Sequence, residues 1–287
     1  MLFLCYDHMN SAILWEECQL KTQDFIVSLA RGTLRLVGVP VMTPEMLVDS
    51  FYKDVDSQLM ANNASNQFRK LFYGHPGSLI HKWDHYLDVY DRHLKRFLDA
   101  RQPIRLLEIG VFHGGSLRLW REYFGCEAII FGVDVNPKCK EIKDCDISIR
   151  IGSQADPEFL KAVVGEMGGL DIVIDDGSHI ASHQRKSFET LFPLLHQDGV
   201  YIVEDLHTSY FRGVFEGGIG RRGTFIEEAK KLVDAIHGWY HNGKSTIANA
   251  RTTVDSLHFY DSIVVIEKRV KQRPFHTKLG VPSFSRK

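Results

Sequence analysis

The chain has 287 residues, of which 44% are hydrophobic and 25% are charged, as in a globular protein with a sizeable core. Its formal net charge is −1, with a pI of about 6.9. This balance argues against a nucleic-acid or anionic-membrane surface spread over the whole chain, although a local patch stays open.

The N-terminus is apolar, but Asp7, Glu16 and Glu17 interrupt it and no basic segment precedes it. It therefore does not resemble a secretory signal, and no apolar run approaches the roughly 18–20 residues that span a bilayer. Five cysteines without a CxxC pair are typical of reduced intracellular thiols. Cys139 and Cys145 have the wrong spacing for a closed zinc site. We expect a cytoplasmic protein without a membrane span.

The first hundred residues are expected to form a helical N-terminal extension, residues 1–99. Residues 10–36 have an amphipathic helical pattern that prolines then break, and Thr43 is a candidate N-cap for a helix from Pro44. A Gly/Pro turn at 74–77 precedes a segment whose ring-bearing and apolar residues recur three and four apart, which predicts a helix. These residues are Tyr86, Val89, Tyr90, His93, Leu94 and Phe97.

From residue 104, short apolar segments alternate with amphipathic ones. The predicted strands are 104–110, 128–135, 147–153, 170–178 and 198–206. The predicted helices are 114–125, 156–167, 181–195 and 222–240, with Asp156 and Thr224 as candidate caps. Residues 256–269 are expected to form a hairpin that turns at 260–262.

Strands that alternate with helices imply parallel crossovers, and continuous apolar strands fit a sheet covered on both faces. The predicted fold class is α/β: a doubly wound, mostly parallel, seven-stranded Rossmann-like sheet with an antiparallel C-terminal hairpin. This domain spans residues 100–270, and a basic tail, 271–287, follows it. Ligands of such sheets bind beyond the carboxyl ends of the strands, where the strand order reverses.

A glycine-containing loop follows the first predicted strand. Gly110, Gly114 and Gly115 would let the backbone approach a ligand, and the next helix presents free N–H groups. The spacing is not GxGxxG, and Glu108 at the mouth of the loop would repel a pyrophosphate. An ordinary strand-to-helix turn is the alternative interpretation.

Polar residues also follow the second and third predicted strands. Asp134 lies about 25 residues beyond the glycine loop, where a carboxylate suits the hydroxyls of a ribose. The alternative is a turn aspartate that binds its own backbone ahead of Pro137. Ser153 and Gln154 are candidates for contact with an adenine edge, or they simply precede the helix cap at Asp156.

Pairs of acids follow the fourth and fifth predicted strands, which should be neighbours in the sheet. Asp175 and Asp176, then Glu204 and Asp205, would repel one another and raise each other's pKa. A hard divalent cation such as magnesium or calcium would resolve that conflict. His179 would lie within reach of a substrate oxygen at such an ion. A solvated acidic rim and a backbone-bonded histidine are the alternatives.

Residues 72–268 resemble the class I S-adenosylmethionine-dependent methyltransferases. More narrowly, they resemble the metal-dependent sugar O-methyltransferases of the macrocin and mycinamicin type and the rhamnosyl O-methyltransferases. The matching segments are "LEIGVFHGGSLRLW", "FGVDVNP", "GSQADPEFL", "DIVIDDGSH" and "GVYIVEDLHTSY", of which the last two are specific. "YGHPGSLIHKWDHYLDVYDRHL" also looks like the segment that such enzymes place before the first strand.

The resemblance implies a methyltransferase that uses S-adenosyl-L-methionine and Mg²⁺ and methylates a sugar hydroxyl of a glycoside (a natural product, glycolipid or polysaccharide). It implies Asp176, Glu204 and Asp205 as metal ligands and His179 as the general base, so that His179 and Asp176 are the catalytic pair. The implied cofactor contacts are Glu108, Gly110, Gly114, Ser116, Asp134, Ser153, Gln154 and Asp175. Asp175 would either face the sulfonium end of the cofactor or orient its neighbours from behind.

The sequence departs from the family pattern in two places and leaves other functions open. Ser153 stands where an acid is frequent, and "GHPG" at 74–77 stands where "GTDK" is usual. The alternatives are a metal-dependent O-methyltransferase of a catechol or small phenol, a non-methylating cofactor-binding relative, and an NAD-dependent Rossmann protein. The absent GxGxxG and Glu108 argue against the last of these.

The acceptor is expected to contact the N-terminal extension, the glycine-rich loop 208–223 or the basic tail. The loop is either a mobile lid or a solvated connection. The tail would meet an anionic acceptor or a neighbouring subunit, or it is a frayed terminus. We expect a small-molecule or glycan hydroxyl acceptor, no nucleic acid, and a homo-oligomer.

Overall fold

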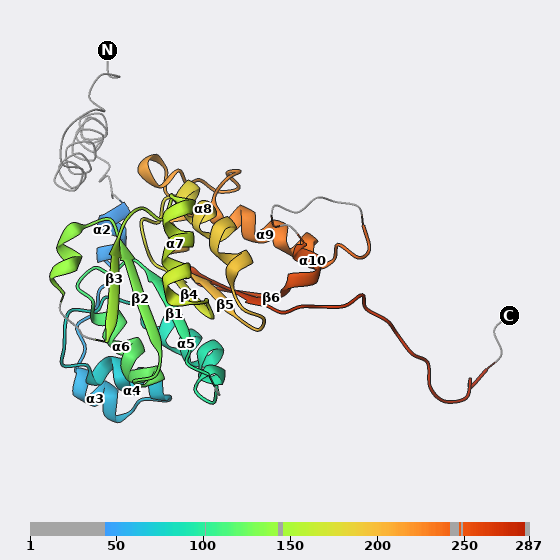
Figure 1. Ribbon diagram of the computed structural model, residues 1–287, viewed down its shortest axis with the longest axis horizontal. Helices are drawn as coiled ribbons and strands as arrows, with labels where there is room; N and C mark the ends of the chain where they lie inside the picture. The colour runs from blue at the N-terminus through green and yellow to red at the C-terminus, as the bar shows by residue number, and fades with distance from the viewer. Residues whose placement is uncertain (1–43, 101, 143–145, 242–246, 248, 285–287) are drawn as a thin grey trace, which may run out of the picture.

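The computed structural model describes residues 44–284, apart from residues 101, 143–145, 242–246 and 248 (Figure 1). The helical pattern at 10–36 and the cap expected at Thr43 lie outside the described residues. The elements that precede the sheet are α2 (Pro44–Asp49), α3 (Ser57–Asn62), α4 (Gln67–Gly74), α5 (Tyr86–Leu94) and η1 (Lys95–Phe97).

Seven strands form one sheet in the order β3-β2-β1-β4-β5-β7-β6. They are β1 (Arg105–Ile109), β2 (Ile129–Asp134), β3 (Ile147–Ile151), β4 (Ile172–Asp175), β5 (Val200–Val203), β6 (Val254–Tyr260) and β7 (Ile263–Lys268). Strands β1 to β5 run parallel, whereas β7 is antiparallel to β5 and β6 is antiparallel to β7. The predicted sheet and its C-terminal hairpin are confirmed.

Helices cover both faces of the sheet (Figure 1). The elements within and after the sheet are α6 (Gly115–Phe124), η2 (Pro137–Glu141), α7 (Pro157–Met167), α8 (Ala181–Leu191), η3 (Phe192–Leu194), η4 (Leu206–Tyr210), η5 (Gly213–Phe215), α9 (Phe225–Ile236) and α10 (Ala250–Thr253). Alternate residues of each central strand point to opposite faces. Leu107 and Val173 join α7, α8 and α9 in one core, and Leu106 and Ile172 join α4, α5 and α6 in the other.

The helix caps that the sequence predicts at Asp156 and Thr224 are present in the structure. The Asp156 side chain accepts hydrogen bonds from Glu158 N and Phe159 N, so it caps α7, and Thr224 caps α9 through Glu227 N. Pro193 lies where the regular helix α8 has given way to the short turn η3, because proline removes a backbone donor.

The N-terminal side of the chain is built into the sheet domain. Phe68 of α4 and Tyr86 and Tyr90 of α5 are fully buried against the face that also carries α6. The predicted division at residue 99 stays a prediction, but α4 and α5 share a hydrophobic core with the strands.

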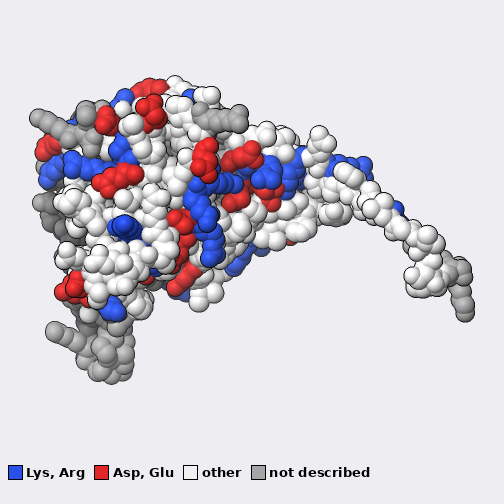
Figure 2. Space-filling model, turned by 90° about the horizontal axis from the view of Figure 1, so that it is seen from below, with Lys and Arg blue, Asp and Glu red and all other residues white. Residues whose placement is uncertain are grey.

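The surface carries mixed charge. On the face shown in Figure 2, acidic and basic side chains are interspersed, and the C-terminal segment projects from the body. Among the described residues, no helix is both long and apolar enough to cross a bilayer.

Candidate active site

The functional side chains gather where the strand order reverses. Strand β1 lies between β2 and β4, and β5 lies beside β4, so the loops after β1, β4 and β5 meet at one edge of the sheet. Gly110 in the first of these loops has a φ of +96°. A Cβ at this position would lie 2.0 Å from the backbone oxygen of Asp176, so the two loops pack backbone to backbone.

Glu108 lies beneath the glycine loop and is completely buried. Its Oε2 accepts a 2.8 Å hydrogen bond from Ser116 Oγ, which ties the strand to the first turn of α6. Burial raises the pKa of Glu108 to about 7. Gly114 caps α6 with a φ of +77°, in the left-handed region that favours glycine.

Asp134, at the end of β2, holds the glycine loop from the side. Its Oδ2 accepts hydrogen bonds from Val111 N at 2.8 Å and Phe112 N at 3.2 Å, and its Oδ1 accepts one from Asn136 N. A carboxylate has about four acceptor positions, so these three bonds leave capacity for a hydroxyl donor.

Asp175, the last residue of β4, is enclosed by hydrogen-bond donors. It is completely buried and accepts hydrogen bonds from Gln154 Nε2 at 3.0 Å, Tyr201 OH at 2.9 Å and Ser187 Oγ. Burial raises its pKa to about 6, against the effect of these donors. The position fits orientation of the β4 loop from behind, the second of the roles expected for Asp175.

Gln154 also contacts the loop after β4, and Ser153 stabilises the turn beside it. The Gln154 side chain also accepts a 2.7 Å hydrogen bond from Ser178 N, so it links the β3 loop to the β4 loop. Ser153 Oγ accepts from Ala155 N at 3.1 Å. Gln154 is 4% exposed, so its amide is largely committed to protein partners.

The side chains of Asp176, His179 and Asp205 converge in the loops that follow β4 and β5. His179 Nε2 lies 3.8 Å from Asp176 Oδ1 and 3.7 Å from Asp205 Oδ2, and all three side chains are partly exposed. One ligand atom of each residue lies within 4.8 Å of the other two. Burial alone would raise the pKa of Asp205, but the charges of His179 and His207 hold it below its ordinary value.

Glu204 occupies the inner part of the site and binds two partners that the sequence analysis missed. Its Oε1 accepts a 2.6 Å hydrogen bond from Tyr90 OH, and its Oε2 lies 2.8 Å from Lys82 Nζ. Burial raises the pKa of Glu204 well above its ordinary value. Burial alone would lower the pKa of Lys82, but the surrounding carboxylates hold it well above the ordinary value.

The side chains of this site fit a hard divalent cation, and they leave two buried polar atoms that a bound ligand could contact. Carboxylate oxygens of Asp176 and Asp205 face the same imidazole, and oxygen is the ligand that magnesium prefers. His179 Nδ1 and Glu108 Oε1 are buried polar atoms without a hydrogen-bond partner in the described part of the chain. Such atoms are expected where a bound group supplies the missing partner.

Comparison with known proteins agrees with this geometry. No family model matches the chain. It is 34% identical over 237 residues to the 8-demethyl-8-(2-methoxy-alpha-L-rhamnosyl)-tetracenomycin-C 3'-O-methyltransferase of Streptomyces olivaceus, covering 78% of this chain and 60% of that protein. It is 36% identical over 209 residues to the demethylmacrocin O-methyltransferase of Streptomyces fradiae, covering 68% of this chain and 50% of that protein. The chain is a relative of the sugar O-methyltransferases.

A solved structure of this group has the same fold. MycE methyltransferase in complex with Mg, SAH and mycinamycin VI superposes with a TM-score of 0.63 at 29% identity, over 80% of this chain and 62% of that chain. The resemblance inferred from the sequence is thereby confirmed. The chain spans between 47% and 60% of the length of the curated sugar O-methyltransferases that it matches.

The site residues that the sequence analysis missed come from the segment before the sheet. Lys82 and Trp83 precede α5, and Tyr86 and Tyr90 lie one turn apart on it. Trp83 Nε1 and Tyr86 OH each donate a 3.0 Å hydrogen bond to Asp205 Oδ1. The three- and four-residue spacing predicted the helix correctly, but it does not show that two of its buried hydroxyls donate hydrogen bonds to the acidic residues that follow β5.

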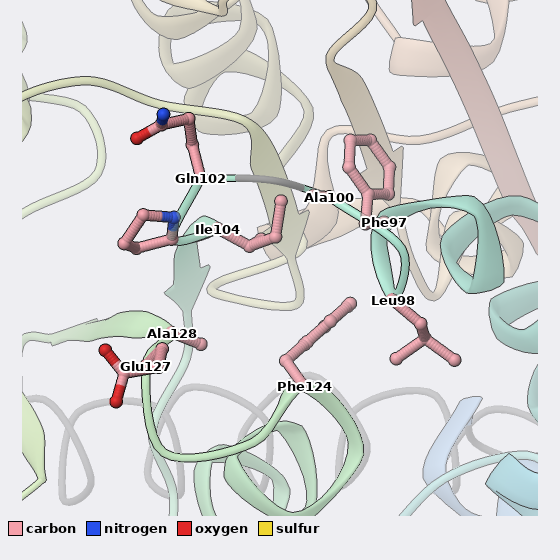
Figure 3. Close-up of a pocket in the computed structure, with 9 residues that line it drawn as sticks. Phe97, Leu98, Ala100, Gln102, Ile104, Phe124, Glu127 and Ala128 are labelled. Carbon is pink, nitrogen blue, oxygen red and sulfur yellow. The ribbon is translucent and has the colours of Figure 1, made fainter.

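A pocket lies at the other end of the sheet from the acidic residues. A pocket of about 240 Å³ is lined by Phe97 and Leu98, by the segment that enters β1, and by the end of α6 (Figure 3). Ile104 and Ala128 immediately precede strands β1 and β2, so this pocket faces the amino ends of the strands. Its lining includes Glu127 but none of the residues expected to bind the cofactor or the metal.

Proposed function

We propose that this chain is an S-adenosyl-L-methionine- and Mg²⁺-dependent O-methyltransferase that transfers a methyl group to a sugar hydroxyl of a glycoside. One observation carries the proposal: Asp176, His179 and Asp205 converge beside the glycine loop, at the carboxyl ends of adjacent strands. The names of the relatives support the reaction and the acceptor class, and the Mg and SAH in the MycE complexes support the two cofactors.

Methyl transfer from a sulfonium is an in-line displacement in which the donor is already activated. A sugar hydroxyl is a weak nucleophile, and a divalent ion would lower the pKa of a hydroxyl bound to it. His179 would accept the hydroxyl proton at Nε2, the atom that faces Asp176 and Asp205. Their negative charges would stabilise the imidazolium that results, so the proton of the hydroxyl is held on His179 Nε2 after the oxygen has been methylated.

The remaining side chains would bind and orient the cofactor. Glu108, Gly110, Gly114 and Ser116 form the floor and loop for the methionine portion, because the backbone there can approach a ligand closely. Asp134 keeps acceptor capacity for the ribose hydroxyls. The proposed adenine contact is Ser153, and Gln154 would hold the turn beside it through its bonds with Asp175 and Ser178. The proposed metal ligands are Asp176, Glu204 and Asp205.

Metal removal tests the proposal. The protein is incubated with S-adenosyl-L-methionine and a panel of rhamnosides, other glycosides and catechols, and methylated products are detected by mass spectrometry. We expect EDTA to abolish methylation of a glycoside and Mg²⁺ in excess to restore it. Full activity in metal-free buffer would contradict the metal requirement, and methylation of catechols alone would favour the phenol alternative.

A homo-oligomeric state and a cytoplasmic location stay predictions from the sequence. The same panel of acceptors tests which sugar, and which of its hydroxyl groups, is methylated. Size-exclusion chromatography with light scattering measures the oligomeric state directly.

A further inference from the structure

An ammonium group lies among the carboxylates of the proposed metal site. Lys82 Nζ is 2.5 Å from Asp176 Oδ2, 2.8 Å from Glu204 Oε2 and 3.7 Å from Glu108 Oε1. The Lys82 side chain is 5% exposed, and those of Glu204 and Glu108 are 1% and 0% exposed. The proposed function gives Lys82 no role, because the reaction uses neither an amine base nor an amine nucleophile.

The charge balance of the site explains why a cation is there. Asp176, Glu204, Asp205 and Glu108 bring four carboxyl groups to one edge of the sheet, and a buried carboxylate without a counter-ion is costly. Lys82 reaches three of these groups at once from outside the parallel sheet. Its single positive charge therefore offsets part of the negative charge of these three groups.

Asp176 divides the site into two parts. Its Oδ2 faces Lys82, whereas its Oδ1 faces His179 together with Asp205 Oδ2. Both oxygens of Glu204 are engaged, one by Lys82 and one by Tyr90. A divalent ion that took Glu204 as a ligand through Oε2 would lie beside the ammonium group, and the two positive charges would repel each other.

We propose that Lys82 is an internal cation that competes with the divalent ion for Asp176 and Glu204, so that the site folds without metal and binds Mg²⁺ only weakly. The inference rests on the proposed function for the presence of a metal. Removing the charge of Lys82 should have two linked effects. The apoprotein loses stability because its carboxylates repel one another, and Mg²⁺ binds more tightly because its competitor is gone.

The test uses Lys82→Met, which keeps the aliphatic stem and removes the charge. Mg²⁺ alone is titrated by isothermal calorimetry, and Tm is measured in EDTA and in Mg²⁺. We expect Mg²⁺ to bind the variant about tenfold more tightly or better, and to raise its Tm by more than it raises that of the wild type. Equal or weaker Mg²⁺ binding by Lys82→Met would overturn the inference.

Lys268→Met is the matched control. Lys268 is also a buried lysine, but its Nζ donates to the carbonyl oxygens of Phe192, Pro193 and Leu195 and not to a carboxylate. Its replacement should lower Tm by the same amount in EDTA and in Mg²⁺. A Mg²⁺-dependent rescue of the control would show that the effect at Lys82 is not specific, and this too would overturn the inference.

A double variant covers the case in which Lys82→Met does not fold. Lys82→Met combined with Glu204→Gln removes one charge of each sign, so it should fold in EDTA better than the single variant. Failure of both to fold would assign Lys82 to packing and overturn the inference. These measurements need no methyl transfer: an inactive protein whose Lys82→Met variant gains Mg²⁺ affinity supports the internal cation and contradicts only the proposed function.

Discussion

His179 and Asp205 both have backbone conformations that side-chain-bearing residues rarely adopt. Their φ values are +55° and +53°, in the left-handed region. Thr208 Oγ1 donates to the carbonyl of His179, and Tyr86 OH accepts from the amide of Asp205. These contacts offset a conformational cost of about 1–3 kcal/mol each. The two uncommon backbone conformations therefore occur at residues whose side chains belong to the proposed site.

Replacement of His179 by alanine tests its role as a base. Turnover should fall by a factor of about 10²–10⁴, because proton transfer from the acceptor hydroxyl loses its catalyst. Binding of S-adenosyl-L-methionine, measured by calorimetry, should change little. His183→Ala is the control, since His183 Nδ1 pairs with Ser178 Oγ and lies outside the acidic cluster. Near-normal turnover of His179→Ala would exclude it as the base.

At the scale of elements, the conformation of the glycine loop after β1 depends on Gly110. Gly110 combines a φ of +96° with a backbone oxygen 2.0 Å from where a Cβ would stand. No rotamer change relieves this clash, since the obstacle is main chain. The loop that should receive the methionine portion can therefore pack against the loop that carries Asp176 only because Gly110 has no side chain.

Gly110→Ala should weaken cofactor binding by about tenfold or more and lower Tm, because one of the two loops must move. The measurements are calorimetric titration with S-adenosylhomocysteine and thermal unfolding. Gly165→Ala is the control: Gly165 lies inside α7, and an added Cβ would meet no described atom within 4 Å beyond its chain neighbours and the backbone of its own helix. It should gain about 0.5–1 kcal/mol of stability. Normal cofactor binding by Gly110→Ala would contradict this account of the loop.

At the scale of the whole molecule, α5 joins the site to the antiparallel edge of the sheet. His93 Nδ1 lies 2.9 Å from Glu267 Oε1 on β7, and Tyr86 OH donates to the carbonyl of Ser262 at the hairpin turn. The same helix brings Tyr90 to Glu204. Helix α5 therefore contacts both the hairpin and the acidic site.

Glu267→Gln should destabilise the protein in a pH-dependent way. The hydrogen bond with His93 lowers the pKa of Glu267 from 4.5 to about 2, so the folded state favours the ionised carboxyl. This stabilisation is fully present above pH 4.5 and is lost as the pH falls towards 2. At pH 7 the variant should melt about 2–4 °C below the wild type.

The difference in Tm between Glu267→Gln and the wild type should shrink between pH 4.5 and pH 3, as differential scanning calorimetry can measure. Glu158→Gln is the control, because Glu158 is exposed and its carboxylate pairs with Lys161 on its own helix. It should show almost no effect at any pH. A constant difference across the range would show that the Glu267 pair does not set the acid stability of this edge.

The sequence by itself determined the strand and helix order, the hairpin at 260–262 and the loops that carry the acids. It did so because periodicity, capping residues such as Asp156 and Thr224, and the rule that parallel strands end at one edge are local or topological properties. The convergence of Asp176, His179 and Asp205 followed from that rule.

Only the tertiary structure decided which partners each acid has. Asp175 is closed in behind Gln154, Ser187 and Tyr201, and Glu204 is held by Lys82 and Tyr90, which lie more than a hundred residues away in the chain. Burial and charge pairing depend on side chains that meet in space, so spacing within one segment carries no signal of them. For that reason, the competition that we propose between Lys82 and Mg²⁺ for Asp176 and Glu204 could be inferred only from the tertiary structure.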